Sequence, residues 1–171
     1  TGRETFLLPV EWKDGWPVIL PRGEVVPLKA KRPALPEAGA PQVPTNGDFS
    51  VRESFSDEGL APYWRSLRGP SAPWLQIENG AAVLRPQQEG LGDFGYPAFL
   101  ARRQQHLNAV AETSVLFDPH NPDEEAGLAA FQNDEYFYAL GVSVNEEGAR
   151  VVRLRRRAGP DTPADGEILA S

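Results

Sequence analysis

The chain has 171 residues, enough for one domain and part of another, and 40% of them are hydrophobic, so a core can form. Its net charge of −7 argues against a general nucleic-acid surface, and no apolar run approaches the roughly 20 residues that cross a bilayer, so neither nucleic acid nor membrane is expected as a partner. The absence of Cys excludes disulfides, thiolate metal sites and thiol nucleophiles, and with no visible leader it slightly favours the cytoplasm.

The first segment is predicted to hold a β-hairpin. Strand-like runs over Thr5 to Val10 and Trp16 to Leu20 flank the turn residues Lys13-Asp14-Gly15. Because two strands alone are only marginally stable in water, this hairpin is expected to pack on something else. Residues 28–48 carry repeated prolines, which indicate either a semi-rigid linker or a long loop wrapped over a surface.

Residues 49–171 are predicted to form a second domain built of strands. Asn79-Gly80 separates two apolar runs and is a strong hairpin signal, because both residues tolerate positive φ. Further turns are predicted at Asn133-Asp134-Glu135 and at Asn145 to Gly148, and strands separated by turns at this spacing are typical of a β-sandwich. The predicted strands are Trp74 to Glu78, Ala81 to Arg85, Ala109 to Phe117, Ala126 to Gln132, Tyr136 to Val144 and Ala149 to Arg157.

The final residues resemble the start of one more strand. Glu167 to Ala170 has this character, and a sandwich that ended there would leave an unpaired edge. We therefore expect the sandwich to be incomplete at this end and the chain to be truncated or cleaved from a longer protein.

Several motifs, in the right order, resemble glycoside hydrolase family 43. GRETFLLPVEWKDGWPVI is similar to the last strands of the family's five-bladed propeller. SFSDEGLAPYWRSLRGP, PAFLARRQQH and EEAGLAAFQNDEYFYALGV resemble the C-terminal sandwich of its β-xylosidase branch. The resemblance implies an all-β chain, a concanavalin A-like (jelly-roll type) β-sandwich preceded by a hairpin remnant of a propeller. The implied domains are residues 1–27 (propeller strands), 28–48 (linker) and 49–171 (sandwich).

The resemblance also implies the activity of a parent enzyme, a β-xylosidase or α-L-arabinofuranosidase. Such enzymes invert configuration with a general acid and a general base roughly 6.5–9.5 Å apart. In the family these acids lie on earlier propeller blades, so no catalytic residue is expected in this chain. Its partners would be the catalytic propeller of the same enzyme and a xylo-oligosaccharide or arabinosyl substrate, and a homo-oligomer is open.

Two substrate-binding residues are implied by the resemblance. Arg3 matches a family arginine that reaches the active site and binds sugar hydroxyls, which suit its fixed fork of donors. Phe94 matches a loop aromatic that the sandwich lends to the propeller pocket, where a ring can exclude water. The alternatives are a solvated terminal arginine and a loop Phe anchoring Pro97 and Phe99, and Tyr96 could serve in place of Phe94.

Other clusters favour structural interpretations. The acidic loop from Asp118 to Glu125 lacks the spacing of an EF-hand, so a solvated loop is expected and no metal site or cofactor is predicted, although a structural Ca²⁺ elsewhere stays open. The basic cluster Arg153 to Arg157 is interpreted as a charged outer strand face that protects a sheet edge. The four tryptophans could form a sugar platform, but Trp64 and Trp74 are expected to be core residues and Trp16 is expected to be packed. The alternative to an accessory part of a glycosidase is an independent carbohydrate-binding module or a purely structural β-sandwich module.

Overall fold

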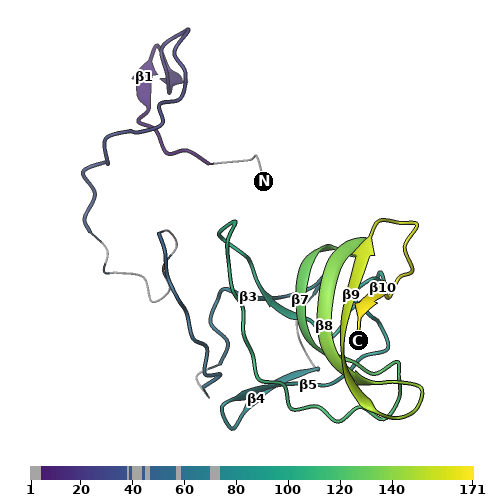
Figure 1. The fold of residues 1–171 in the computed structure, drawn as a ribbon. Helices are drawn as coiled ribbons and strands as arrows, with labels where there is room; N and C mark the ends of the chain where they lie inside the picture. The colour runs from purple at the N-terminus through teal and green to yellow at the C-terminus, as the bar shows by residue number, and fades with distance from the viewer. Residues whose placement is uncertain (1–4, 38, 40–43, 45–46, 57–58, 70–73) are drawn as a thin grey trace. The chain divides into compact units, whose positions relative to one another are not determined.

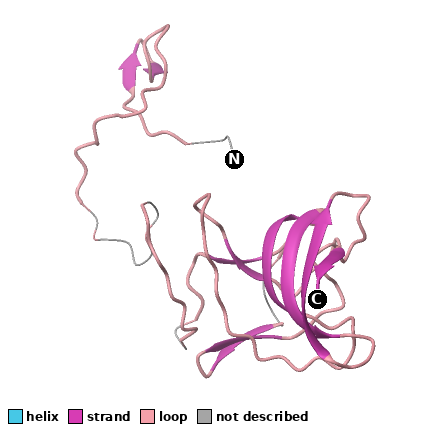
Figure 2. Cartoon of the chain, in the orientation of Figure 1, coloured by secondary structure: helices cyan, strands magenta, loops and turns pink. Residues whose placement is uncertain are grey.

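A computed structural model describes residues 5–37, 39, 44, 47–56, 59–69 and 74–171 of the chain. The chain divides into two compact units, Thr1–Gly47 and Asp48–Ser171. Every regular element among the described residues is a β-strand, as predicted (Figures 1 and 2).

The first unit holds one short hairpin. Strand β1 (Glu11–Lys13) pairs with β2 (Trp16–Val18) across Asp14 and Gly15, which both have positive φ. The predicted turn is confirmed, but the expected strand over Thr5 to Val10 is wrong, because a two-residue turn pairs the residues that directly precede it. Trp16 is 75% exposed, which contradicts the prediction that this side chain is packed.

The second unit is dominated by a four-stranded antiparallel sheet (Figure 1). Its order is β10 (Glu167–Ala170), β9 (Arg150–Ala158), β8 (Tyr136–Val144) and β7 (Ala126–Asn133). All four strands lie where the sequence predicts them. Short turns connect β7 to β8 and β8 to β9. Because these strands follow one another directly, each pair is aligned along most of its length.

The two faces of this sheet differ. On β8, alternate residues from Phe137 to Ser143 are buried, and Phe137 stacks on Phe131 of β7, which in turn contacts Phe99 at a ring-centroid distance of 5.2 Å. We call this the inner face. Tyr136, Tyr138 and Leu140 on β8 alternate with these buried residues and are exposed, and they belong to the outer face. A period of two thus separates the buried side chains from the exposed ones.

Two smaller strand pairs complete the unit. Strand β4 (Leu75–Glu78) pairs with β5 (Ala81–Leu84) around Asn79-Gly80, as predicted, and Trp74 just before β4 is buried, also as predicted. Strand β3 (Trp64–Ser66) pairs with β6 (Leu100–Arg102). The sequence did not indicate β3, because three residues are too few to establish alternation.

Two predictions for this unit are wrong. Ala109 to Phe117 alternates but forms no strand, and Val110 and Leu116 are exposed. Alternation produces a strand only where a partner strand is present to pair with it. The Arg153 to Arg157 cluster does not protect an edge, because β9 lies between β8 and β10.

Candidate functional site

The most prominent exposed ring of the second unit is carried by the loop between β5 and β6. Within this loop, residues 90–96 form a segment that we call the aromatic loop. Phe94 is 90% exposed at this position, and Tyr96 is exposed as well. Burying a ring is the usual way in which Phe stabilises a fold, so an exposed Phe with defined surroundings suggests a role in contact.

Arg68 contacts the aromatic loop on both sides of Phe94. Its Nη1 donates to the carbonyl oxygens of Asp93 and Gly95, each at 2.9 Å, and its Cζ lies 4.8 Å from the centroid of the Phe94 ring. Its Nη2 forms an ion pair with Oδ2 of Asp134 at 3.0 Å. One guanidinium thus connects the aromatic loop to the β7–β8 turn, using the several donors of its planar fork.

Arg157 supplies a second connection between the same two segments. This residue lies near the end of β9, and its Nη1 donates to the carbonyl oxygens of Gly92, at 2.9 Å, and Asp134, at 2.6 Å. On the inner face, Arg155 of the same strand pairs with Glu125 at 3.1 Å. The basic cluster is therefore turned mainly toward loops of this unit and ties them to the sheet.

Close neighbours leave little room for a side chain at two glycines of the aromatic loop. A Cβ atom at Gly92 would overlap the carbonyl oxygen of Ala164, and a Cβ atom at Gly95 would press on the side chain of Glu89. Inside the loop, Asp93 accepts a hydrogen bond from the backbone N–H of Gly90 at 2.7 Å. The loop is held by its backbone, which leaves the ring of Phe94 outside.

A second cluster surrounds the carboxylate of Glu53. Its Oε2 accepts hydrogen bonds from the Tyr63 hydroxyl at 2.7 Å and from Trp64 Nε1 at 3.0 Å, while Oε1 accepts from the backbone of Phe55. The Trp64 and Tyr63 hydrogen bonds hold the pKa of Glu53 below its ordinary value, and the bond to Glu53 raises the pKa of Tyr63. Arg102 lies 4.6 Å from the centroid of the Tyr63 ring. This carboxylate joins Trp64 of β3 to Tyr63 and to the segment around Phe55, which is a structural role.

The carboxylates of the acidic loop have separate partners. Asp118 pairs with Arg150, and Glu124 accepts hydrogen bonds from the His120 backbone and the Asn121 amide, which together lower the pKa of Glu124. Among the described residues, no three His, Asp or Glu side chains gather in a way that could hold a metal ion.

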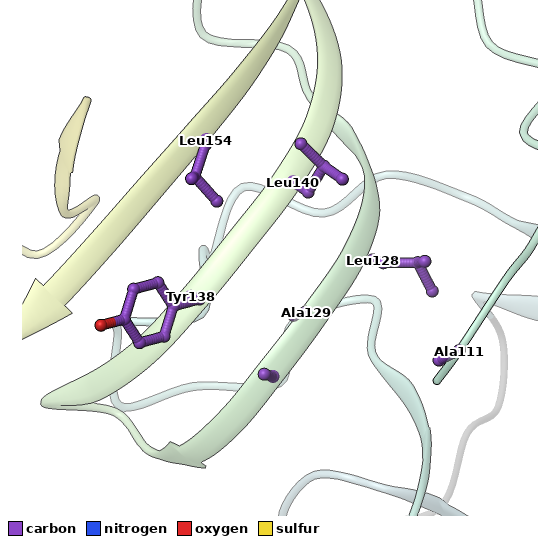
Figure 3. A pocket seen from close by; sticks show the side chains of 7 residues that line it. Ala111, Leu128, Ala129, Tyr138, Leu140 and Leu154 are labelled. Carbon is purple, nitrogen blue, oxygen red and sulfur yellow. The ribbon is translucent and has the colours of Figure 1, made fainter. Parts of the chain in front are cut away.

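A shallow hollow on the outer face of the sheet has an apolar lining. Leu128, Tyr138, Leu140 and Leu154 line it from three neighbouring strands, and Ala111 approaches from a separate segment (Figure 3). None of the residues that line the hollow is charged, so the hollow offers contact area without acid–base chemistry.

The structure shows the surroundings of only one of the two implied substrate-binding residues. Phe94 is solvent-exposed and its ring lies against Arg68, while Arg3 lies outside the described residues. Sequence reasoning missed Arg68, and it placed Arg157 on a charged outer strand face, whereas Arg157 binds loop carbonyls. Asp134 was indicated by the sequence as a turn residue of the predicted Asn133-Asp134-Glu135 hairpin, without its ion pair.

Comparison with known proteins identifies the class of this all-β chain. Residues 52–168 match the family model described as the β-xylosidase C-terminal concanavalin A-like domain. The chain belongs to this family, and the predicted resemblance to glycoside hydrolase family 43 is confirmed.

The relatives are larger enzymes. The chain is 32% identical to the non-reducing end α-L-arabinofuranosidase BoGH43B of Bacteroides ovatus, over 99% of this chain and 33% of that protein, and 33% identical to a β-xylosidase of Bacillus subtilis, over 90% of this chain and 28% of that protein. A solved structure titled Bacteroides ovatus xyloglucan PUL GH43B superposes with a TM-score of 0.72 at 27% identity, covering 99% of this chain and 31% of its own. The chain thus spans about a third of the length of these relatives, in which the matched region is part of a longer polypeptide.

One negative result concerns membranes. In the ranges that the structure describes, no helix is long and apolar enough to cross a bilayer.

Proposed function

We propose that this chain is the accessory C-terminal part of a glycoside hydrolase that removes terminal xylose or arabinose from xylo-oligosaccharides. In such an enzyme a carboxylic acid protonates the leaving oxygen while a carboxylate activates water on the opposite face of the sugar, which inverts the configuration. These two groups would belong to a catalytic propeller outside this chain. The relatives named as a β-xylosidase and an α-L-arabinofuranosidase support both substrate classes.

The contribution of this chain would be to complete the sugar pocket with Phe94. The observation that carries this proposal is an exposed aromatic ring whose loop is fixed by Arg68 and Arg157. A ring held in place can close a pocket and exclude water without a large loss of its own conformational entropy. Residues 1–27 would form the last strands of the propeller, residues 28–48 the linker, and Arg3 would bind sugar hydroxyls.

Phe94→Ala in the longer enzyme tests this proposal. We expect kcat/KM for an aryl β-xyloside or aryl α-L-arabinofuranoside to fall on the order of tenfold, because an aromatic contact contributes about 1 kcal/mol or somewhat more. The unfolding midpoint should change little, because the ring is exposed. Leu116→Ala removes another exposed apolar side chain and is the matched control. Unchanged kinetics in Phe94→Ala would refute the role of the ring, and Arg3→Lys in the same assay tests Arg3.

A second candidate function is an independent carbohydrate-binding module. It is favoured by Tyr136 and Tyr138, two exposed rings on the outer face of β8. Sugar rings can stack on such aromatic surfaces. This alternative predicts that the isolated chain binds xylan and that Tyr138→Ala weakens the binding, whereas the main proposal predicts neither.

A further inference from the structure

Arg68 has an unusual backbone conformation and contacts both the aromatic loop and the β7–β8 turn. It follows β3 closely and has a φ of +62°, a left-handed conformation that side-chain-bearing residues seldom adopt. Its side chain is only 20% exposed and that of Asp134 is 34% exposed, so the ion pair between them is partly shielded from water. The surroundings therefore define where this guanidinium lies.

The contacts of Arg68 and Arg157 differ in one important way. Arg157 binds the Gly92 carbonyl oxygen at the start of the aromatic loop and does not contact the Phe94 ring in any described interaction. Arg68 binds the carbonyl oxygens of Asp93 and Gly95, the residues directly before and after Phe94, and it also lies over the ring. Both the backbone and the ring of Phe94 are therefore oriented by a single side chain.

We infer that Arg68, held by Asp134, is a positioning residue that orients Phe94 for the sugar pocket. This inference rests on the proposed function of Phe94 and assigns Arg68 no contact with substrate. Loss of the guanidinium removes the donors to both neighbouring carbonyls and the cation beneath the ring, so the ring samples other orientations. Lysine cannot replace Arg68, because a single ammonium lacks the planar fork that reaches two carbonyls and a carboxylate together.

The first experiment measures kcat and KM in the longer enzyme. Arg68→Ala and Phe94→Ala should lower kcat/KM by similar factors, on the order of tenfold, and should change the same kinetic parameter. The double variant should be no worse than Phe94→Ala alone, because Arg68 acts through that ring. Arg68→Lys should not restore activity. Asp134→Asn, which keeps the backbone carbonyl bound by Arg157, should give a smaller loss in the same direction, and it provides the test if Arg68→Ala does not fold.

The control is Arg150→Ala. This residue starts β9, at the opposite end of that strand from Arg157, and pairs with the exposed Asp118. The Arg150→Ala substitution removes an arginine ion pair that does not involve the aromatic loop. The kinetics of this variant should therefore match those of the unaltered enzyme.

A second experiment measures the loop itself. The 171-residue chain has no Cys, so a nitroxide attached at Phe94→Cys labels one position. Its electron paramagnetic resonance spectrum should show slow motion in the otherwise unaltered chain and faster motion when Arg68→Ala is added, but not when Arg150→Ala is added.

The outcomes separate the inference from the proposal on which it rests. If Phe94→Ala impairs activity while Arg68→Ala does not, or if the two losses multiply, the positioning role of Arg68 is wrong and the role of Phe94 stands. Unchanged nitroxide motion in Arg68→Ala would also overturn the positioning role. If Phe94→Ala has no kinetic effect, the proposed function of the ring fails, and the inference fails with it.

Discussion

Single arginines organise the second unit at the residue scale. A guanidinium presents five donors in one plane, so one side chain can satisfy carbonyls from several loops at once. Arg68, Arg155 and Arg157 each join segments that lie far apart in the chain. Composition and spacing could not reveal these contacts, because the sequence around an arginine does not show whether its guanidinium faces water or a distant loop. The exposure of Phe94, by contrast, was implied by the family resemblance.

The hydrogen bonds of Glu53 predict a contribution to the free energy of unfolding that depends on pH. Its carboxylate accepts hydrogen bonds from Tyr63 and Trp64, which lower its pKa in the folded chain. A lowered folded pKa means that the stabilisation is complete above the ordinary glutamate value of about 4.3 and is lost as the pH falls through the folded value. At pH 7, Glu53→Gln should lower the free energy of unfolding by about 1 kcal/mol, because the amide nitrogen cannot accept a hydrogen bond and partial exposure weakens the loss.

Urea unfolding of both forms at neutral pH and near pH 3 measures this effect. The difference between them should shrink at the acidic pH, where the unfolded chain already binds the proton. A difference that stays constant over this range would show that the ionised form of Glu53 is not what stabilises the fold.

Turns set the register of the sheets at the scale of elements. Asp14-Gly15, Asn79-Gly80 and the Asn133 to Glu135 turn were all predicted, because short turns demand particular residues and so leave a local signal. Ala109 to Phe117 shows the limit of local signals. Its alternation is strand-like, yet pairing depends on what lies beside it in space, which a local pattern does not contain.

The β4–β5 hairpin offers a sharp test of this dependence on turns. Asn79 has a φ of +53°, which Asp also tolerates and a β-branched residue does not. Asn79→Val should therefore lower the free energy of unfolding by roughly 1–2 kcal/mol, and Asn79→Asp at the same position by much less. Thermal or urea unfolding measures both, and equal losses would show that the left-handed backbone is not the cause.

At the scale of the molecule, the second unit is organised by a sheet with a buried inner face and an outer face that carries an apolar hollow. Phe137 and Ala139 belong to the inner face, while Tyr138, Leu140 and Leu154 line the hollow outside. The strand-built class of the second unit followed from the turn residues and from the strand-like runs between them. The concanavalin A-like family followed only from motifs, because alternation alone indicates a sandwich without specifying which one.

At this scale we expect the 171-residue chain to lack glycosidase turnover. Hydrolysis with inversion needs a paired acid and base, which the proposal assigns to a propeller outside this chain. The chain should therefore release no nitrophenol from aryl xylosides or arabinofuranosides above the rate of a buffer control. Turnover that survives purification, and that is lost on changing one of the chain's own acids, would mean that the catalytic pair lies within these residues.

The hydrogen bonds that hold the aromatic loop affect how this domain could change during evolution. Arg68 and Arg157 hold the aromatic loop through the main-chain oxygens of residues 92, 93 and 95, atoms that every amino acid possesses. These hydrogen bonds therefore do not depend on which side chain occupies position 94. A lineage, or an engineer, could exchange that ring for a larger, smaller or polar group and reshape sugar preference while the supporting domain keeps its stability.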